Sequence, residues 1–335
     1  MRWKLWIYVL LIAVSLLAAQ VGAAGAWLPV AFVHDQVWAI PRIGGRELRF
    51  FTDTGGGWNA ISRAQVEALG LMIIDGEADN DGPVALIDFP AFDAGHGLPP
   101  PPKHFMQGRL LVVDASEIPR SDGFLGGRWF ADGIWEFDYP RQKLRRLRSV
   151  VGRVNPADRI SLGFQVDTSG HRSTHFPSMR ITVDGETLDM LLDSGATATL
   201  TKVSGAAFGL PAGTDIGTSF IEHEVFERWH QRHPDWRVLD RADLKGSQER
   251  RMIEVPQITV AGHSVGPVWF AEQPSGAFQQ YMATMMDRPT WGALGGSALK
   301  YFCVVIDYPA AAAWFHHPAP AGYRSKDHRA PQHAP

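Results

Sequence analysis

The feature that most constrains the fold is that the chain contains two copies of one pattern. The segment Ile43–Gly55 aligns without gaps with the segment Val183–Gly195, at an offset of 140 residues. A second block, Gly123–Pro140, aligns with Gly292–Pro309 at an offset of 169. Such a duplication predicts two structurally equivalent units. Because the offset grows from 140 to 169, the second unit holds 29 more residues between the two blocks.

Each copy has the same local pattern. Two apolar-alternating runs flank a glycine-containing dipeptide, Gly44-Gly45 or Asp184-Gly185, and lead into Asp-Thr-Gly or Asp-Ser-Gly. Such dipeptides are typical of tight hairpin turns, so the runs beside them are predicted to be paired strands. The stretches Ser62–Leu71 and Thr201–Leu210 each predict one short helix, whose first residue supplies a capping hydroxyl. The predicted fold class is mostly β.

The two tripeptides place one aspartate at the end of a strand in each copy, Asp53 in the first and Asp193 in the second. Two carboxyl groups that approach within about 3 Å cannot both ionise, so they share one proton. The ionised carboxylate then polarises a water, while the protonated carboxyl hydrogen-bonds the substrate carbonyl. The pair therefore predicts general acid–base hydrolysis of an amide without a covalent intermediate.

The residues around these aspartates resemble those of the aspartic proteases, in particular the retropepsin-like enzymes, here fused into two lobes as in pepsin. The loops Phe50–Gly55 and Met190–Thr197 are similar to the family's apolar-apolar-x-Asp-Thr/Ser-Gly loops. The segments Phe124–Gly126 and Ala293–Gly295 are similar to its apolar-apolar-Gly strand, which passes behind each loop. The resemblance covers residues 30–317 apart from an insertion. It implies a bilobal fold of two retropepsin-like β-barrels with few short helices.

The resemblance also implies an activity and a set of site residues. The chain would be an aspartic endopeptidase that hydrolyses peptide bonds with a water activated between Asp53 and Asp193. Thr54 and Ser194 would form a hydrogen-bonded grip between the lobes. The other implied site residues are Gly55 and Gly195 in the loops, and Leu125, Gly126, Leu294 and Gly295 in the strands behind them. The alternative is a catalytically inactive peptide-binding or structural protein of the same fold.

The first loop departs from the family's pattern. Gly56-Gly57 makes it one residue longer than the second loop, which has Ala196. Pepsin-like enzymes also carry a tyrosine on the first-lobe flap, and none occurs between residues 53 and 138. The retropepsin-like enzymes are therefore the better comparison. Flap hairpins are expected near Phe92–Gly97 and near Lys245–Gln248.

The duplication predicts how the chain is divided. Residues 1–26 form a signal peptide or N-terminal anchor, and residues 27–150 form the N-terminal lobe. Residues 151–317 form the C-terminal lobe, with an insertion around 219–244. The tail 318–335 is rich in proline, alanine, histidine and charge, so it is expected to be disordered.

The N-terminus predicts export. A basic start precedes an apolar run over residues 5–19 and then small residues, as in a signal peptide. Cleavage is expected after Ala23 or after Ala26. The alternative is an uncleaved membrane anchor through residues 5–33, because these 29 uncharged residues exceed the roughly 20 that span a bilayer. Either way the protein is expected in the periplasm or outside the cell.

Composition and motif spacing argue against several other functions. The net charge of −3, from 32 basic and 35 acidic residues, lacks the basic excess that nucleic-acid binding needs. Cys303 is the single cysteine, which excludes an intrachain disulfide and a cysteine-based zinc site. The pair His230 and His233 does not complete a zincin motif, so neither a metal nor a cofactor is predicted. The expected partner is a polypeptide substrate. Because both aspartates lie in one chain, a monomer is expected to be active.

Overall fold

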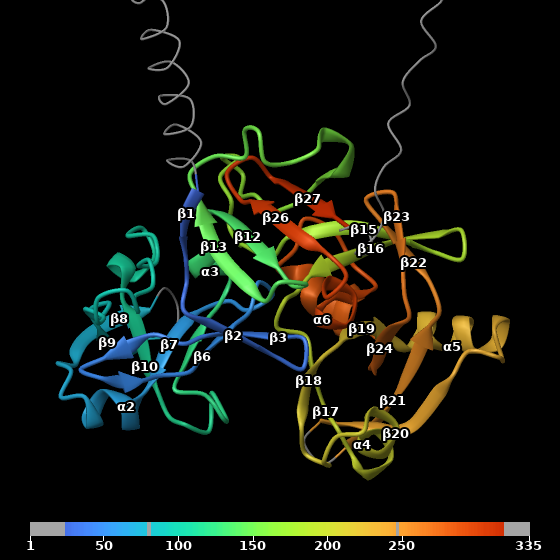
Figure 1. Ribbon diagram of the computed structural model, residues 1–335, viewed down its shortest axis with the longest axis horizontal. Coiled ribbons are helices and arrows are strands. Elements are labelled where there is room, and N and C mark those ends of the chain that lie inside the picture. The colour runs from blue at the N-terminus through green and yellow to red at the C-terminus, as the bar shows by residue number, and fades with distance from the viewer. Residues whose placement is uncertain (1–23, 79–81, 246–247, 318–335) are drawn as a thin grey trace, which may run out of the picture.

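The structure is a computed structural model that describes residues 24–78, 82–245 and 248–317. Three large sheets of eight, nine and six strands form most of it (Figure 1), which confirms the mostly-β fold class. Each sheet has two free edges in its strand order, so none of the sheets in the described ranges closes into a barrel. The predicted pair of β-barrels is therefore replaced by open sheets. Below, the chain up to residue 150 is called the first half and the rest the second half.

The eight-stranded sheet comes entirely from the first half. Its order is β2-β3-β6-β11-β7-β10-β9-β8. Its strands are β2 (Val30–Val33), β3 (Gln36–Ala39), β6 (Phe50–Thr52), β7 (Asn59–Ser62), β8 (Ile74–Ala78), β9 (Gly82–Ile87), β10 (Leu110–Val113) and β11 (Gly123–Leu125). The short hairpin β4 (Arg42–Ile43) and β5 (Arg46–Glu47) precedes β6, and the helix α2 (Arg63–Ala68) follows β7.

The nine-stranded sheet comes entirely from the second half, in the order β20-β21-β24-β19-β25-β16-β15-β22-β23. Its strands are β15 (Ser178–Val183), β16 (Glu186–Leu192), β19 (Ser219–Glu222), β20 (Val238–Lys245), β21 (Gln248–Val255), β22 (Ile258–Val260), β23 (His263–Val265), β24 (Val268–Gln273) and β25 (Gly292–Leu294). Outside it lie β17 (Thr197–Thr199), β18 (Asp215–Gly217), α4 (Lys202–Phe208), α5 (His223–Arg232), η3 (Ala277–Tyr281) and η4 (Met282–Thr284).

The six-stranded sheet joins the two halves, in the order β1-β13-β12-β26-β27-β14. Its strands are β1 (Ala24–Trp27), β12 (Ile134–Asp138), β13 (Lys143–Leu147), β14 (Arg159–Ser161), β26 (Cys303–Asp307) and β27 (Ala312–His316); the short helices nearby are α3 (Gly127–Phe130), α6 (Gly296–Leu299), η1 (Met106–Gly108) and η2 (Pro156–Asp158). Strand β12 pairs antiparallel with β26, its equivalent in the duplication. The halves therefore meet through a two-fold pairing of equivalent strands.

Local signals that were read from the sequence are found in place. The backbone of Gly44-Gly45 and of Asp184-Gly185 has positive φ at all four residues, as a two-residue hairpin turn of type I′ requires. The hydroxyl of Ser62 accepts a hydrogen bond from the third residue of α2, and Thr201 forms a reciprocal capping box at α4. Both predicted helices are confirmed.

Strand pairing shows where the second half is longer. Up to the aspartate loops, equivalent residues such as Phe51 and Leu191 lie 140 positions apart. In the next strand the distance is 160 positions, because Phe220 pairs with Ala293 as Ala60 pairs with Phe124. The additional residues of the second half therefore lie in two places. One is the segment β17-α4-β18 after the aspartate loop, and the other is the η3–η4 segment before β25. Helix α5 follows β19 just as α2 follows β7. This placement differs from the insertion expected around 219–244, because helix α4 mimics α2 in sequence but not in topology.

One hydrophobic core runs through both halves. At its centre Phe130 of the first half packs on Trp135 and Phe137 and stacks on Tyr308 of the second half, with a ring-centroid distance of 6.3 Å to Tyr308. All four side chains are almost fully buried. Removing such large aromatic surfaces from water makes this contact a main source of cohesion between the halves.

The termini bear on the export predictions. Strand β1 contains residues 24–26, which the signal-peptide prediction includes, so a cut after Ala23 leaves this strand whole whereas a cut after Ala26 removes most of it. No helix in the described ranges is long and apolar enough to cross a membrane. The predicted signal sequence up to residue 23 and the tail 318–335 lie outside the described residues.

Candidate active site

The two aspartates follow equivalent strands. Strand β6 ends before Asp53 and runs parallel to β11, while β16 ends before Asp193 and runs parallel to β25. The N–H of Asp53 donates to the Leu125 carbonyl at 2.9 Å, and the N–H of Asp193 donates to the Leu294 carbonyl at 3.0 Å. The strands predicted to lie behind the loops are therefore there, and they fix where each aspartate leaves its sheet.

The glycine after each of these strands permits close backbone contact. A Cβ at Gly126 would lie 2.5 Å from the Trp58 carbonyl oxygen, and one at Gly295 would lie 2.1 Å from that of Thr218. Two residues that the sequence analysis missed hold these glycines: Gly126 N–H donates to Asn59 Oδ1, and Gly295 N–H donates to Ser219 Oγ, both at 3.0 Å. Asn59 and Ser219 are equivalent only at the offset of 160, which the motif alignment does not reveal.

The loops bring the two carboxyl groups together. A Cβ at Gly55 would lie 2.6 Å from Cγ of Asp193, and a Cβ at Gly195 would lie 2.2 Å from Cγ of Asp53. Each glycine thus lies against the opposite carboxyl group, where no side chain fits. Asp53 and Asp193 also hydrogen-bond to each other. Asp53 is partly exposed, whereas Asp193 is 8% exposed.

Thr54 and Ser194 tie the two loops to each other. Thr54 Oγ1 donates to the Leu192 carbonyl at 2.8 Å and accepts from the Ser194 N–H at 2.9 Å. Ser194 Oγ accepts from the Thr54 N–H at 3.1 Å. Both side chains are buried, so these bonds are shielded from competing water. The predicted grip between the loops is present in the geometry.

The protonation of the pair follows from its surroundings. Burial raises the pKa of Asp53 well above its ordinary value, and the charge of Asp193 and the hydrogen bond to it raise this pKa further. Burial also raises the pKa of Asp193, but the hydrogen bond from Asp53 and the N–H of Gly195 oppose that rise. Two carboxyl groups this close cannot both ionise, so the pair shares one proton.

The additional glycine in the first loop has a packing reason. A Cβ at Gly56 would lie 2.6 Å from Cζ of Phe124 and 3.1 Å from Oδ2 of Asp53. In the second half Ala293 stands where Phe124 does, and Ala196 fits there with its methyl group buried. Gly56 therefore makes room for the Phe124 ring, and the longer loop still leaves Asp53 against Asp193.

The side chains beside the two aspartates differ. Phe124 packs between Trp58 and Phe51, with ring-centroid distances of 5.0 and 6.1 Å. On the equivalent face of the second half, Leu191 and Ala293 are covered by a cluster that includes Phe278 and Met286 of the additional segment. The surroundings are aromatic next to Asp53, and aliphatic and more fully covered next to Asp193.

Two buried tyrosines lie below the pair. Tyr139 and Tyr308 end equivalent strands, and their hydroxyl groups have no hydrogen-bond partner within the described part of the chain. A cavity of about 10 Å³ separates Tyr139 from Thr54 and Ser194. Burial raises the pKa of both tyrosines, so they stay neutral.

One flap prediction matches a hairpin and the other does not. The turn between β20 and β21 falls at the predicted segment, and Lys245 pairs with Gln248 across it. The equivalent hairpin of the first half is formed by β8 and β9, not by Phe92–Gly97. The latter segment is a loop whose Asp93 carboxylate accepts from the N–H groups of Gly44 and Gly45, both at 2.8 Å.

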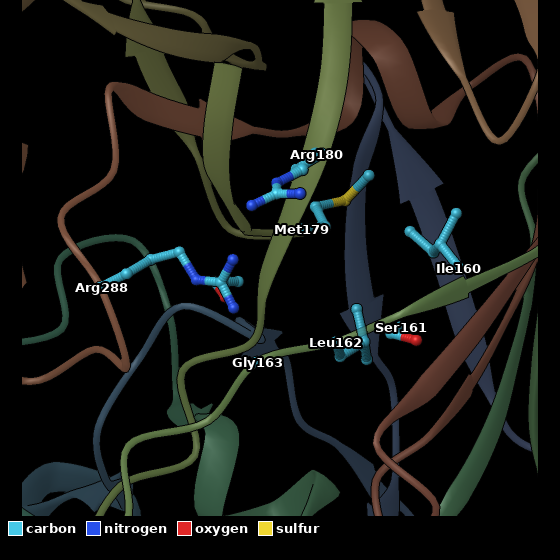
Figure 2. A pocket seen from close by; sticks show the side chains of 8 residues that line it. Ile160, Ser161, Leu162, Gly163, Met179, Arg180 and Arg288 are labelled. Atoms are coloured by element: carbon cyan, nitrogen blue, oxygen red, sulfur yellow. The ribbon is translucent and has the colours of Figure 1, made fainter. Parts of the chain in front are cut away.

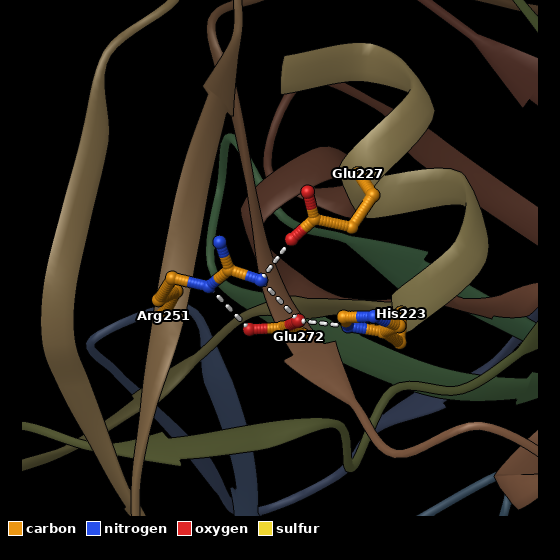
Figure 3. Close-up of polar contacts among 4 residues, drawn as sticks. All are labelled: His223, Glu227, Arg251 and Glu272. Carbon is orange, nitrogen blue, oxygen red and sulfur yellow. Dashed lines mark hydrogen bonds and ion pairs between the residues drawn. The ribbon is translucent and has the colours of Figure 1, made fainter. Parts of the chain in front are cut away.

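Other polar clusters are paired internally. Figure 3 shows His223, Glu227 and Glu272 around the guanidinium of Arg251, which donates to Glu272 at 2.8 and 2.6 Å and also to Glu227. The positive charge that a metal would supply there is already supplied by Arg251. His233 Nε2 lies 2.9 Å from Asp184 Oδ2, directed away from this cluster.

A pocket of about 410 Å³ lies on the second half (Figure 2). Arg180 and Arg288 stand at its wall, and both contact the carboxylate of Asp189, at 3.0 and 3.4 Å. Neither Asp53 nor Asp193 lines this pocket. It is separate from the paired carboxyl groups.

Comparison with known proteins does not support the family resemblance. No family model matches the chain, and no curated protein matches it. Among solved structures the chain is similar to conglutin gamma, a basic 7S globulin from lupine seeds, with 11% identity and a TM-score of 0.43 over 88% of this chain and 95% of that one. The assignment of the chain to the aspartic proteases is therefore corrected: no family model and no curated protein supports it.

Proposed function

We propose that the protein is an endopeptidase that hydrolyses peptide bonds with a water activated between Asp53 and Asp193. The observation that carries the proposal is the contact between these two carboxyl groups, which share one proton at the junction of two equivalent loops. A family likeness is not part of the argument. The support comes from the chemistry of the pair alone.

The proposal assigns the shared proton to Asp53, whose pKa is raised well above its ordinary value, and the negative charge to Asp193. The Asp193 carboxylate takes a proton from the water as the water oxygen attacks the carbonyl carbon, and Asp53 donates its proton to the carbonyl oxygen. When the carbon–nitrogen bond of the resulting diol breaks, Asp193 gives its proton to the leaving nitrogen and a hydroxyl proton returns to Asp53. The pair ends in its starting state, and no cofactor takes part.

The proposal includes an arrangement and a location. The eight- and nine-stranded sheets act as two lobes, and an extended peptide binds between them across the aspartates. One chain supplies both carboxyl groups, so the monomer is the active unit. The apolar run over residues 5–19 directs the protein to the periplasm or the exterior, with or without a retained tether.

Cleavage of denatured proteins and a mixed peptide pool by the purified full chain, from pH 3 to 8, tests the proposal. Asp53→Asn and Asp193→Asn should each abolish cleavage while the chain stays folded by circular dichroism. Asp114→Asn is the matched control, because this carboxylate is exposed and, among the described residues, pairs only with Arg63, at 3.6 Å. If the wild-type chain binds peptides but cuts none at any pH, it is the inactive peptide-binding protein instead.

A further inference from the structure

The hairpin of β20 and β21 is anchored next to the loop that follows Asp193. The Thr199 N–H donates to Asp243 Oδ1 at 2.8 Å, and Leu200 forms an antiparallel bridge with Asp243. Asp243 is fully buried, so this contact fixes the base of the hairpin against the body of the second half. Lys245 lies two residues beyond Asp243 at the end of β20, and β20 contacts β17, the strand that follows the Asp193 loop.

The side chain of Lys245 lies on the same face as the aspartate pair. Alternate residues of a strand share a face, so Lys245 projects on the side of Asp243, toward the body. Its Nζ lies 5.8 Å from the centroid of the Phe220 ring. Phe220 is two strands away from Leu191, through Ala293, and all three share one face of the sheet. Leu191 immediately precedes the end of β16, two residues before Asp193.

Lys245 also meets the electrostatic conditions for contact with substrate. Its positive charge lowers the pKa of Asp193, which is consistent with their proximity. The side chain is exposed, and no carboxylate of the described residues forms an ion pair with it. The aromatic ring beside it holds the ammonium group in place without neutralising it.

We propose that Lys245 makes the site prefer peptides that carry a negatively charged side chain at one position close to the scissile bond. This inference rests on the proposed peptidase activity. An extended peptide advances about 3.3 Å per residue, so three residues on either side of the cut span about 10 Å, and the position is sought within that range. The substrate class is therefore acidic peptides, recognised by one lysine of the second half.

The test measures kcat/KM on sets of peptides. Within a set the peptides differ at one position, and the sets place that position at each of the three residues on either side of the cut. The side chains are glutamate, glutamine and lysine at pH 6, and cysteic acid if activity is confined to acid pH, because glutamate loses its charge near pH 4. At one position the wild-type protein should prefer the anionic side chain about two- to fivefold, as expected for an exposed ion pair. Lys245→Met should remove the preference, and Lys245→Glu should transfer it to lysine.

Lys202→Met is the matched control, because Lys202 is another exposed lysine of the second half, at the start of α4, and should leave the preference unchanged. If the wild-type protein cuts all peptides equally, the preference is overturned and the peptidase activity stands. If Lys245→Met only shifts the pH profile equally for every peptide, Lys245 acts on Asp193 and not on substrate, which also overturns the preference. If no peptide is cut, the proposed activity itself fails.

Discussion

The two aspartate loops share their framework and differ in what surrounds it. In both, a parallel strand fixes the aspartate N–H, and a glycine lies against the opposite carboxyl group. Yet Gly56 faces the Phe124 ring in the first loop, whereas in the second loop the equivalent residue is the buried Ala196 and the small Ala293 stands in the place of Phe124. The backbone hydrogen bonds and the two contact glycines are the same in both loops, so we infer that the paired carboxyl groups require them. The neighbouring side chains differ, so their identity is less restricted.

The two carboxyl groups also differ in their surroundings. The pKa of Asp53 is raised well above its ordinary value, whereas hydrogen bonds and the charge of Lys245 oppose the rise in the pKa of Asp193. A nearly symmetric scaffold therefore holds its two carboxyl groups in unequal environments. Substitutions in the two loops test how far their equivalence extends.

The largest effect is expected on catalysis, where the loops should be equivalent. Asp53→Asn and Asp193→Asn should each reduce kcat/KM by about 10²- to 10⁴-fold, because either change removes the acid–base pair. The measurement is peptide cleavage by folded protein. A large loss in one variant and nearly full activity in the other would show that a single aspartate acts alone.

Packing should break the equivalence. Gly56→Ala should lower the free energy of unfolding by about 1–3 kcal/mol, because the added methyl group meets the Phe124 ring at 2.6 Å. Ala196→Gly should cost about 1–2 kcal/mol, through added freedom of the unfolded chain and loss of a buried methyl group, without any steric conflict. Denaturant titration measures both.

Combining Gly56→Ala with Phe124→Ala gives the first half the two alanines that the second half has at the equivalent positions, Ala196 and Ala293. The double variant should lose less than the sum of the two single changes, because the methyl group then has space. If the two changes in the free energy of unfolding simply add, the Phe124 ring is not the reason why position 56 requires glycine.

The two grip hydroxyls should differ by a smaller amount. Thr54 Oγ1 makes two hydrogen bonds across the loops and Ser194 Oγ makes one. Thr54→Ala should therefore lower the free energy of unfolding by about 2 kcal/mol and Ser194→Ala by about 1 kcal/mol. Thermal unfolding at fixed pH measures both variants. Equal losses of stability would contradict the expected difference between the two hydroxyl groups.

The smallest effect is a pH dependence from His175, which the second half contributes next to the first loop. Burial, together with the charge of Arg172, lowers the pKa of His175 to about 4, below its ordinary 6.5. Between these values the unfolded chain binds a proton that the folded chain does not, so stability falls as the pH drops from 6.5 toward 4. His175→Gln should flatten this part of the stability curve, measured by urea unfolding at pH 7 and pH 5. If the slope does not change, groups other than His175 cause the pH dependence of stability in this range.

The local elements and the aspartate pair were within reach of the sequence, because hairpin turns, helix caps and a strand followed by Asp-x-Gly depend on neighbouring residues. The location of the additional residues was not, since α4 copies the capping pattern of α2 while strand pairing assigns the place of α2 to α5. The fit of Gly56 to Phe124 joins residues 68 positions apart, which no local pattern reveals. The motifs also pointed to a family that the comparisons do not support.

The pairing of β12 with β26 decides whether half of this chain could assemble with itself. In the whole chain Glu136 stands opposite Val305, its equivalent at the offset of 169. Two copies of the first half joined through the same strand would set Glu136 against Glu136, so each carboxylate would depend on its own ion pair with Arg145, 2.6 Å away, to limit the repulsion. In the whole chain the uncharged Val305 removes that demand. The pairing therefore suits two different halves better than two copies of the first.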